Sequence, residues 1–591
     1  MFTSLRFPSP RSTWRSNGEH ATRRWATFLV GAVIVLILGN ACVAVAAPLG
    51  NKILAKAPSD ECFVDVGSPL NSYDPAFYPN GVKCTAPAVP KVNQAYVWGL
   101  TKSGSKLWFG TVANTLCLVV GGILGFSDPI ETPSYVCEFN QNQQFHSDSR
   151  PPQILSYEPK HKKLTAFTML QIPQLQSTLG LRSAGSLGNM VFLAGPSWGF
   201  SVNMFAFDSP SGAFLGFKSF PMYSDIRTWA VYKGVLYAGV QNKADSTGRV
   251  LRWIGTPANP FVGGPNNNGF EEVGTLDAEA ANLAVHMGRL YATTWTGFLA
   301  LNPSPTLAGL FMSPAIDPVN GLTTNDPWTK VWSIDQYESD PNVASTLAGG
   351  AIASYCGKLY WGMMQIPFSG AEVLAEKYPA NFTDAASLAT AFLGTTRPIP
   401  IFRCCGNPSA APNVELLYGS VLLPVYDSVL NRFNFQPNNM HVPPLYGPAG
   451  FGNPFNTYTW SMAVYKNKLF VGTFDWTYLL LDGLVLIPQF FDGSGLLNIP
   501  TLFGLENILE GTMAPAAVGA GADLWRFDSP KKPALPESRT GVGNHLNYGV
   551  RNMVADDALY VGSANAMNLK TDPGTRRNPK PMGGWELRVL Y

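Results

Sequence analysis

The sequence predicts an all-β protein assembled from repeated sheet units, and three observations carry that prediction. Aromatic residues make up 12% of the 591-residue chain, which also contains 57 Gly and 48 Pro. Many aromatics together with many Gly and Pro are typical of short strands joined by turns rather than of long helices. The third observation is a phrase of Leu, an aromatic residue and a nearby Gly that recurs along the chain, as at 464–476.

Each copy of this phrase starts with a turn residue, and most copies continue with one spacer and Leu-aromatic-x-Gly. The seven copies, the second of them looser, start at Lys106, Gly188, Gly234, Gly288, Gly357, Asn467 and Asp557. An alternating strand precedes the turn, as at 459–465, so each copy predicts a β-hairpin. The Gly that ends the second strand indicates a place where another backbone approaches closely.

The spacing of the hairpins predicts a β-propeller. The copies lie 46 to 110 residues apart, and several precede a further strand, expected at 249–253, 297–301 and 523–527. Repeated sheet units of this kind are typical of propeller blades, so we expect seven four-stranded blades with long inserted loops. Six or eight blades are alternatives, and so are two stacked β-sandwich domains.

The repeats resemble the blades of kelch-type and quinoprotein-type β-propellers. Residues 204–216, MFAFDSPSGAFLG, are similar to a quinoprotein strand-turn-strand phrase in which an Asp precedes a Thr/Ser-Gly turn. The resemblance covers about 95–591 and implies an architecture. WD dipeptides at blade ends and the Asp-box phrases of sialidases are absent from the sequence.

The adjacent Cys404 and Cys405 add a second point of resemblance. Such a pair forms a strained disulfide ring near the cofactor of some quinoprotein alcohol dehydrogenases, so it would imply a quinone cofactor here. Those enzymes repeat an Asp-x-x-Thr-Gly-x-x-x-Trp phrase, of which this chain has at most one loose copy. We therefore expect no cofactor and keep a quinone as the alternative.

The first 46 residues predict export. Residues 1–24 are basic, an uncharged apolar run follows at 25–39, and small residues come next. This order is typical of a secretory signal, with cleavage expected after Ala46. The alternative is an uncleaved membrane anchor, because residues 25–47 are long enough to span a bilayer. Either reading predicts a periplasmic, cell-surface or secreted protein.

The remaining chain divides into two expected parts, a Cys-containing extension at 47–90 and the propeller domain at 91–591. Residues 583–591 form an alternating strand. A propeller must close by pairing one such strand with a distant part of the chain, and residues 91–98 are the candidate partner.

Cysteine usage agrees with export, because seven cysteines outside the leader predict disulfides in an oxidising compartment. Cys62 with Cys84, and Cys117 with Cys137, would each close a loop of about 20 residues. Since seven is an odd number, at least one thiol is free or pairs between chains. No Cys or His spacing suggests zinc or haem, so no metal site is expected.

For the vicinal pair two pairings stay open. Cys404 could bond to Cys405, or one of the two could bond to Cys356 and leave the other free or paired elsewhere.

Charge and motifs exclude several classes of function. Five Arg and one Glu lie in residues 1–46, so the formal charge of +2 for the whole chain leaves −2 for the body. A nearly neutral body argues against a nucleic-acid-binding protein, which needs a basic face. The sequence also lacks a phosphate-binding Gly-rich loop, a dinucleotide fingerprint and a Ser nucleophile elbow.

The candidate binding site follows from the expected strand order. The strand before each turn should be innermost, and ligands usually bind where such strands meet the connecting loops. Counting back about eight residues from each repeated Leu gives the candidates Arg227, Trp229, Asn282, Tyr458, Trp460 and Arg551. Aromatic faces would take sugar rings, and Arg and Asn would take hydroxyls or carboxylates. Alternatively, the Trp residues pack between blades and the Arg residues pair with carboxylates.

Catalytic candidates are weaker. His441 and His545 lie in loops that precede two of these strands, where a general base could reach the channel. Asp475 and Glu586 are carboxylates next to Trp residues, and Asp475 could simply cap a turn.

No acid/base pair or metal cluster is evident in the repeats, so the sequence predicts a binding or scaffold protein that recognises a glycan or a protein on one propeller face. The alternative is a propeller enzyme on a polysaccharide, glycoside or alcohol, acting as a lyase, a hydrolase or a quinoprotein-like oxidoreductase. Two carboxylates roughly 5 to 10 Å apart in the channel would favour a glycosidase.

Overall fold

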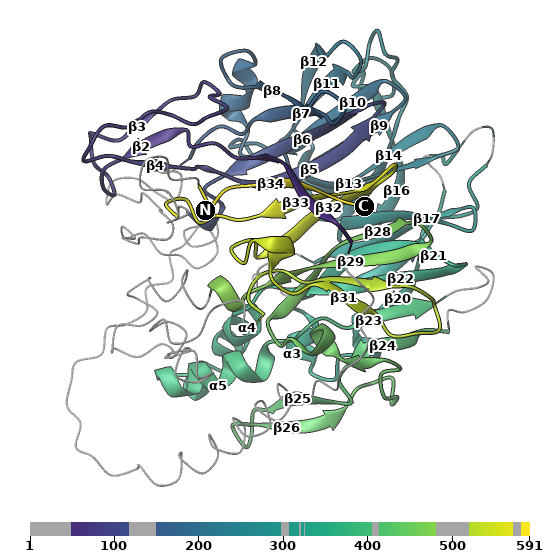
Figure 1. Ribbon diagram of the computed structural model, residues 1–591. Coiled ribbons are helices and arrows are strands. Elements are labelled where there is room, and N and C mark those ends of the chain that lie inside the picture. Colours follow the sequence, from purple (N-terminus) through teal and green to yellow (C-terminus); the bar gives the residue numbers. More distant parts are fainter. Residues whose placement is uncertain are drawn as a thin grey trace.

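The computed structural model describes residues 49–117, 149–296, 306–404, 413–479, 519–570 and 581–591, except 318, 320, 324 and 325. Within these residues the chain consists mainly of antiparallel strands, and its helices are short and lie in connections (Figure 1). The all-β prediction is confirmed. The leader at 1–46 lies outside the described residues, so its fate remains a prediction. None of the helices in the described ranges has both the length and the apolar character needed to span a membrane.

The described strands pair into seven four-stranded antiparallel units, numbered in chain order. Unit 1 holds β5 (Gln94–Ser103), β6 (Lys106–Ala113), β7 (Ile154–Glu158) and β8 (Lys163–Phe167). Unit 2 holds β9 (Ser183–Leu187), β10 (Met190–Pro196), β11 (Val202–Asp208) and β12 (Ala213–Phe220). Unit 3 holds β13 (Tyr223–Tyr232), β14 (Val235–Asn242), β15 (Gly248–Trp253) and β16 (Phe270–Leu276).

The later units follow the same order. Unit 4 holds β17 (Glu279–His286), β18 (Arg289–Trp295), β19 (Gly309–Met312) and β20 (Thr329–Ser333). Unit 5 holds β21 (Leu347–Tyr355), β22 (Lys358–Gln365), β23 (Ile401–Cys404) and β24 (Glu415–Gly419). Unit 6 holds β28 (Asn456–Tyr465), β29 (Lys468–Asp475), β30 (Leu524–Phe527) and β31 (Leu535–Ser538). Unit 7 holds β32 (Gly549–Ala555), β33 (Leu559–Ala564), β34 (Glu586–Leu590) and β1 (Asn51–Lys56).

The units are arranged as in a β-propeller. Their first strands contact one another in the order β5, β9, β13, β17, β21, β28 and β32, and β32 contacts β5 again. The strand before each repeated turn is thus the innermost, as the sequence predicts, and apolar clusters fill the spaces between neighbouring units. The expected strands at 249–253 and 523–527 correspond to β15 and β30, whereas 297–301 lies outside the described residues.

The repeated phrase forms the turn and second strand of each unit for local reasons. Lys466 and Asn467 both adopt positive φ, 47° and 57°, which gives the turn twist that suits a two-residue hairpin. The Gly of the phrase makes room for the next unit, because a Cβ at Gly472 would lie 2.4 Å from Val550. The close approach at this position is therefore that of the Val550 side chain rather than of another backbone.

Unit 7 is completed by a strand from the other end of the sequence. β34 pairs with β33 on one edge and with β1 on the other, from Asn51 opposite Leu590 to Lys56 opposite Glu586. The expected partner of this strand, residues 91–98, instead supplies the start of the innermost β5. Residues 51–56 supply hydrogen-bond partners for the backbone groups at the outer edge of β34. They therefore belong to the propeller rather than to a separate extension.

The rest of the expected extension forms a small three-stranded sheet of β2 (Glu61–Phe63), β3 (Ser72–Tyr73) and β4 (Val89–Lys91). The predicted Cys62–Cys84 disulfide closes this segment, with the Cα atoms 5.4 Å apart. A disulfide of this kind is compatible with an exported protein.

The other cysteines test the open pairings only in part. Cys117 and Cys404 are both disulfide-bonded, but Cys137 and Cys405 lie outside the described residues. Cys356 is an exposed free thiol. The alternative that pairs Cys356 with Cys404 or Cys405 is therefore wrong.

Most of the long connections share one face of the propeller, which we call the insertion face. Strands alternate in direction within a unit, so connections that follow second and fourth strands leave from the same side. They include the β2–β4 sheet, α3 (Pro341–Ala344), α4 (Ser369–Lys377), α5 (Ala385–Thr395), β25 (Leu422–Asp427), β26 (Arg432–Pro437) and β27 (Gly447–Pro448). Short 3₁₀ turns lie at Pro173–Ser177, Ile334–Gln336, Pro379–Asn381, Ala449–Gly452 and Gly541–Gly543. Figure 1 shows β2, β3 and β4 at the upper left of the molecule and α4 and α5 below them.

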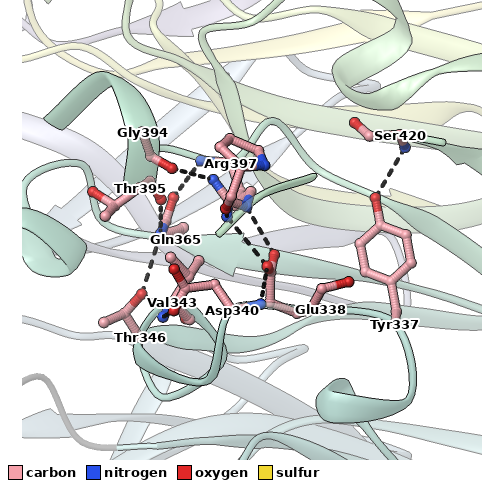
Figure 2. A network of polar contacts seen from close by, with 12 residues as sticks. Tyr337, Glu338, Asp340, Val343, Thr346, Gln365, Gly394, Thr395, Arg397 and Ser420 are labelled. Atoms are coloured by element: carbon pink, nitrogen blue, oxygen red, sulfur yellow. Dashed lines mark hydrogen bonds and ion pairs between the residues drawn. The ribbon is translucent and has the colours of Figure 1, made fainter. Parts of the chain in front are cut away.

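A buried ion pair anchors the helical insertion (Figure 2). Nε of Arg397, which follows α5, donates to Oε2 of Glu338 at 2.7 Å. The Arg397 amide donates to Oε1 of Gln365, at the end of β22, at 2.6 Å, and its Nη2 donates to the carbonyl of Pro424 in β25 at 2.7 Å. One residue, through its amide and its side chain, therefore connects the helices and the β25–β26 hairpin to unit 5.

Candidate functional site

The innermost strands bulge at equivalent positions near the insertion face. In β5 the register with the second strand shifts between Val97 and Gly99, and in β13 it shifts between Ile226 and Thr228. Matching shifts occur in β17, β28 and β32. The extra residues are Trp98, Arg227, Ala281, Trp460 and Arg551. A bulge leaves one residue unpaired and re-aims its side chain, so these positions depart from the regular alternation of their strands.

Three guanidinium groups lie over indole rings around the propeller axis. The distances from guanidinium carbon to ring centroid are 5.5 Å for Arg182 over Trp98, 3.9 Å for Arg227 over Trp295 and 5.4 Å for Arg551 over Trp460. Such stacking attracts a cation to the ring face. These six residues, with Asp225, Glu279 and Tyr458, are the axial cluster.

Two carboxyl groups sit among the three arginines. Arg182 forms an ion pair with Asp225, and Nε of Arg227 lies 3.9 Å from Oε1 of Glu279. Burial and the adjacent Asp225 raise the pKa of Glu279 to about 8, so near neutral pH the Glu279 carboxyl is protonated.

Positive charge is crowded in this cluster. Burial, followed by repulsion from Arg182, lowers the pKa of Arg227 to about 10. Burial and the same two neighbouring arginines lower the pKa of Arg551 well below its ordinary value. Three guanidinium groups face two carboxyl groups, so the cluster carries an excess of positive charge.

Several N–H groups of the arginines have no acceptor. Nε of Arg182, Nε and Nη1 of Arg227 and Nε of Arg551 are buried without a hydrogen-bond partner among the described residues. Nη2 of Arg551 donates to the carbonyl of Arg182 at 3.3 Å. Buried polar groups in folded proteins are nearly always paired, so a group of orphaned donors at one place indicates a site for an acceptor.

Aromatic side chains support the cluster from units 6 and 4. Tyr458 packs edge-on against Trp460, with ring centroids 5.7 Å apart, and against Trp295 at 6.4 Å. Trp460 also packs edge-on against Tyr96 at 5.8 Å, and the hydroxyls of Tyr96 and Tyr548 are hydrogen-bonded. These contacts hold the Trp460 ring rigidly beneath Arg551.

The structure brings together four of the six predicted binding residues, namely Arg227, Tyr458, Trp460 and Arg551. Trp229 does not join the cluster, so its prediction is wrong. Its indole stacks on Phe192 at 5.7 Å and donates to Ser183, which places it between units 2 and 3. Asn282 follows a bulge residue in β17, and no hydrogen bond in the described ranges joins it to the cluster. Sequence reasoning also missed Arg182, Asp225 and Glu279, which lie just before or at the first residues of inner strands.

Neither histidine candidate reaches the axial cluster through a contact in the described part of the chain. His441 is exposed in the loop before β27, and its amide donates to the Asn438 carbonyl. His545 packs its ring against Tyr478 at a centroid distance of 5.4 Å. Among the described residues no group of three His, Cys, Asp or Glu side chains could hold a metal ion.

A second polar feature is a repeated loop that sequence reasoning missed. The phrase G-x-G-N-x-x-N occurs at 450–456 and again at 541–547, before the inner strands of units 6 and 7. In both copies the last Asn donates to the carbonyl of the first Gly at 3.0 Å. The matching spacing of two Gly and two Asn was the available signal.

The two loops hold different acids. In unit 6, Asn453 donates to Asp475 at 3.0 Å and Asn456 donates to Asp523 at 2.9 Å. Asp475 also accepts from the Thr477 amide at 2.6 Å, so the predicted turn cap is present. Burial and the nearby Asp523 raise the pKa of Asp475 to about 7, and burial raises the pKa of Asp523 to about 6.

Unit 7 has one acid where unit 6 has two. Asn565 occupies the place of Asp475 and caps Met567 in the same way, and Glu586 occupies the place of Asp523. Burial raises the pKa of Glu586, but Arg588 and Lys56 outweigh burial and hold that pKa below its ordinary value. The two loops therefore share a backbone and differ in charge.

Comparison with protein-family models and with curated proteins gave no match. Among solved structures, a prolyl endopeptidase is similar at 7% identity and a TM-score of 0.35, over 80% of this chain and 46% of that one. This chain thus spans about half the length of that protein. The β-propeller domain of the Trilobed protease from Pyrococcus furiosus matches at 8% identity and a TM-score of 0.22, over 56% of this chain and 87% of the domain. An endo-arabinanase from Bacillus licheniformis matches at 12% identity and a TM-score of 0.21, over 49% and 87%. None of these likenesses assigns a function to this chain.

Proposed function

We propose that the chain is an exported, closed seven-bladed β-propeller that binds a glycan at its axial cluster. The cyclic contacts of the innermost strands and the pairing of β1 with β34 support the closed seven-bladed reading. One observation supports the proposed position of the binding site. Arginine and tryptophan side chains from units 1 to 4, 6 and 7 converge at one place, and the arginines there have unpaired N–H groups.

The chemistry of the cluster suits a sugar. Indole rings accept the apolar faces of sugar rings, and guanidinium groups donate several hydrogen bonds in a fixed plane. Because Trp460 is fixed by Tyr96, Tyr458 and Phe474, its ring is preorganised and little conformational entropy would be lost when a ligand binds. The opening to solvent would lie near Arg182, whose side chain is 21% exposed.

Binding is favoured over glycoside hydrolysis by the spacing of the acids. Glycosidases place their two carboxyl groups about 5 to 9.5 Å apart, so that a sugar bond or a water fits between them. Asp225 instead lies close enough to the Glu279 carboxyl to raise its pKa, and Arg182 and Arg227 form ion pairs with the two acids. Acids held side by side in this way leave no room for the scissile bond.

A glycan array probed with the full-length exported protein tests this proposal, with binding of positive glycans then measured by calorimetry. We expect Trp460→Phe to weaken glycan binding about threefold to tenfold, since one rigid aromatic contact is reduced. Trp229→Phe is the matched control, because Trp229 lies on an equivalent inner strand but packs between units. Equal losses in both variants, or binding of proteins but of no glycan, would contradict the proposal.

A further inference from the structure

We infer that the ligand held by the axial cluster is an acidic sugar, whose anionic oxygens complete the hydrogen bonds of Arg182, Arg227 and Arg551. This inference rests on the proposed glycan-binding function and names the ligand class of that site. Carboxylate and sulfate groups share the recognising chemistry, and the experiment below distinguishes them.

The first support is the balance of charge. The cluster brings three guanidinium groups to Asp225 and Glu279. Even with both carboxyl groups ionised, one positive charge remains in excess. Arg227 and Arg551 are buried, with a side-chain exposure of 5% and a residue exposure of 8%, and a buried charge requires a partner of opposite sign.

The second support is the set of unused donors. Nη1 of Arg182 donates to Asp225, and Nη2 of Arg551 donates to a backbone carbonyl. Nε of all three arginines and Nη1 of Arg227 make no hydrogen bond in the part of the chain that the structure describes. A neutral sugar hydroxyl could accept from one of these groups. An anionic group with two or three oxygens accepts from several at once and neutralises charge as well.

The third support is a comparison with an arginine elsewhere in the same propeller. Arg403 also lies over an aromatic ring, with its guanidinium carbon 5.7 Å from the Tyr360 centroid. Its Nε donates to Glu415 at 2.8 Å, and its Nη1 reaches the Pro530 carbonyl and the Tyr360 hydroxyl. The Nε group of this structural arginine thus has a carboxylate acceptor, whereas Nε of each axial arginine has no hydrogen-bond acceptor among the described residues.

The test uses oligogalacturonate and its fully methyl-esterified form, in which a neutral methyl ester replaces each carboxylate, together with a sulfated galactan oligosaccharide. Isothermal titration calorimetry on the full exported chain should show the acid bound at least tenfold more tightly than the ester. Arg551→Gln should remove most of that preference, Arg551→Lys should keep part of it, and Arg403→Gln should leave it unchanged. A preference for sulfate over carboxylate would assign the sulfated source and keep the inference.

The possible failures are distinguishable. Equal affinity for the acid and the ester would overturn the inference and leave the proposed glycan binding in place. An acid preference that persists in both Arg551→Gln and Arg227→Gln, with unchanged circular dichroism, would place the anion elsewhere and overturn it too. No binding of any glycan, charged or neutral, would overturn the proposed function itself.

Discussion

At the residue scale, the loops before β28 and β32 combine one backbone with different charges. In both loops the last Asn donates to an acid at the start of the third strand, but unit 6 presents Asp475 and Asp523 where unit 7 presents Asn565 and Glu586. Unit 7 also supplies the Arg588 and Lys56 cations, whereas Trp525 takes the place of Arg588 in unit 6. The pKa values of Asp475 and Asp523 in unit 6 are therefore raised, whereas the pKa of Glu586 in unit 7 is held below its ordinary value.

This difference predicts how stability changes with pH. An unfolded Asp titrates near pH 4, whereas folded Asp475 titrates at about 7. The folded state holds the proton more tightly, so this contribution to stability is complete below about pH 4 and is lost as pH rises through about 7. In Asp475→Asn the fall between pH 5 and 8 should be smaller, and the variant should be more stable at pH 8 by on the order of 2 kcal/mol. Urea unfolding at several pH values measures this, and parallel profiles for the two proteins would contradict it.

Glu279 gives a second prediction at this scale, for ligand binding. It faces Asp225 and Arg227 from β13 and Arg182 from the loop before β9, and its pKa is raised to about 8. Below that pH the carboxyl is protonated and does not repel an anion. Affinity for oligogalacturonate should thus fall about threefold to tenfold between pH 7 and pH 9, because a negative charge appears beside the site. Glu279→Gln should bind the same oligosaccharide with little change over this range, and a fall equal to that of the wild type would count against the assignment.

At the scale of elements, β1 completes unit 7 by pairing with β34. It is the outermost strand of unit 7 and lies more than 500 residues from its partner β34 in the chain. Most of its side chains are exposed or half-buried, so its contribution comes mainly from backbone pairing that covers the edge of β34.

Proline substitution tests the closing strand. Ala55, opposite Leu587 in the ladder, should not tolerate proline, and Ala55→Pro should lower stability by on the order of 2 kcal/mol, measured by thermal unfolding. Ala385→Pro is the control, since Ala385 is the first residue of α5 and follows the extended Asp384, a place where proline fits. Equal stability of wild type and Ala55→Pro would mean that β1 does not hold unit 7.

At the scale of the whole molecule, the sequence predicted what local patterns determine. The Leu-aromatic-x-Gly phrase marks the second strands because its turn, core Leu and close-approach Gly act within ten residues or so. The closing role of β1 could not be predicted, because NKILAK is a short edge strand and nothing local names a partner at the other end of the chain.

Four residues of the candidate site were predicted from the sequence. The errors and omissions at the other positions have physical reasons. Regular alternation places Arg227 and Trp229 on the same side of β13, yet the bulge at Arg227 lets that side chain join the axial cluster while Trp229 packs against Phe192. A bulge leaves no trace in a period of two. Asp225 and Glu279 were missed because carboxylates at strand ends usually cap turns, and only the fold shows that they meet.

A crystal structure of the full chain soaked with oligogalacturonate would test acidic-sugar binding at the axial cluster directly. We expect a carboxylate of the ligand within hydrogen-bond distance of Nε of Arg551 and of Arg227, with a sugar ring against an axial indole. An ordered ligand bound on another surface, while the axial arginines keep their unpaired N–H groups, would contradict this expectation.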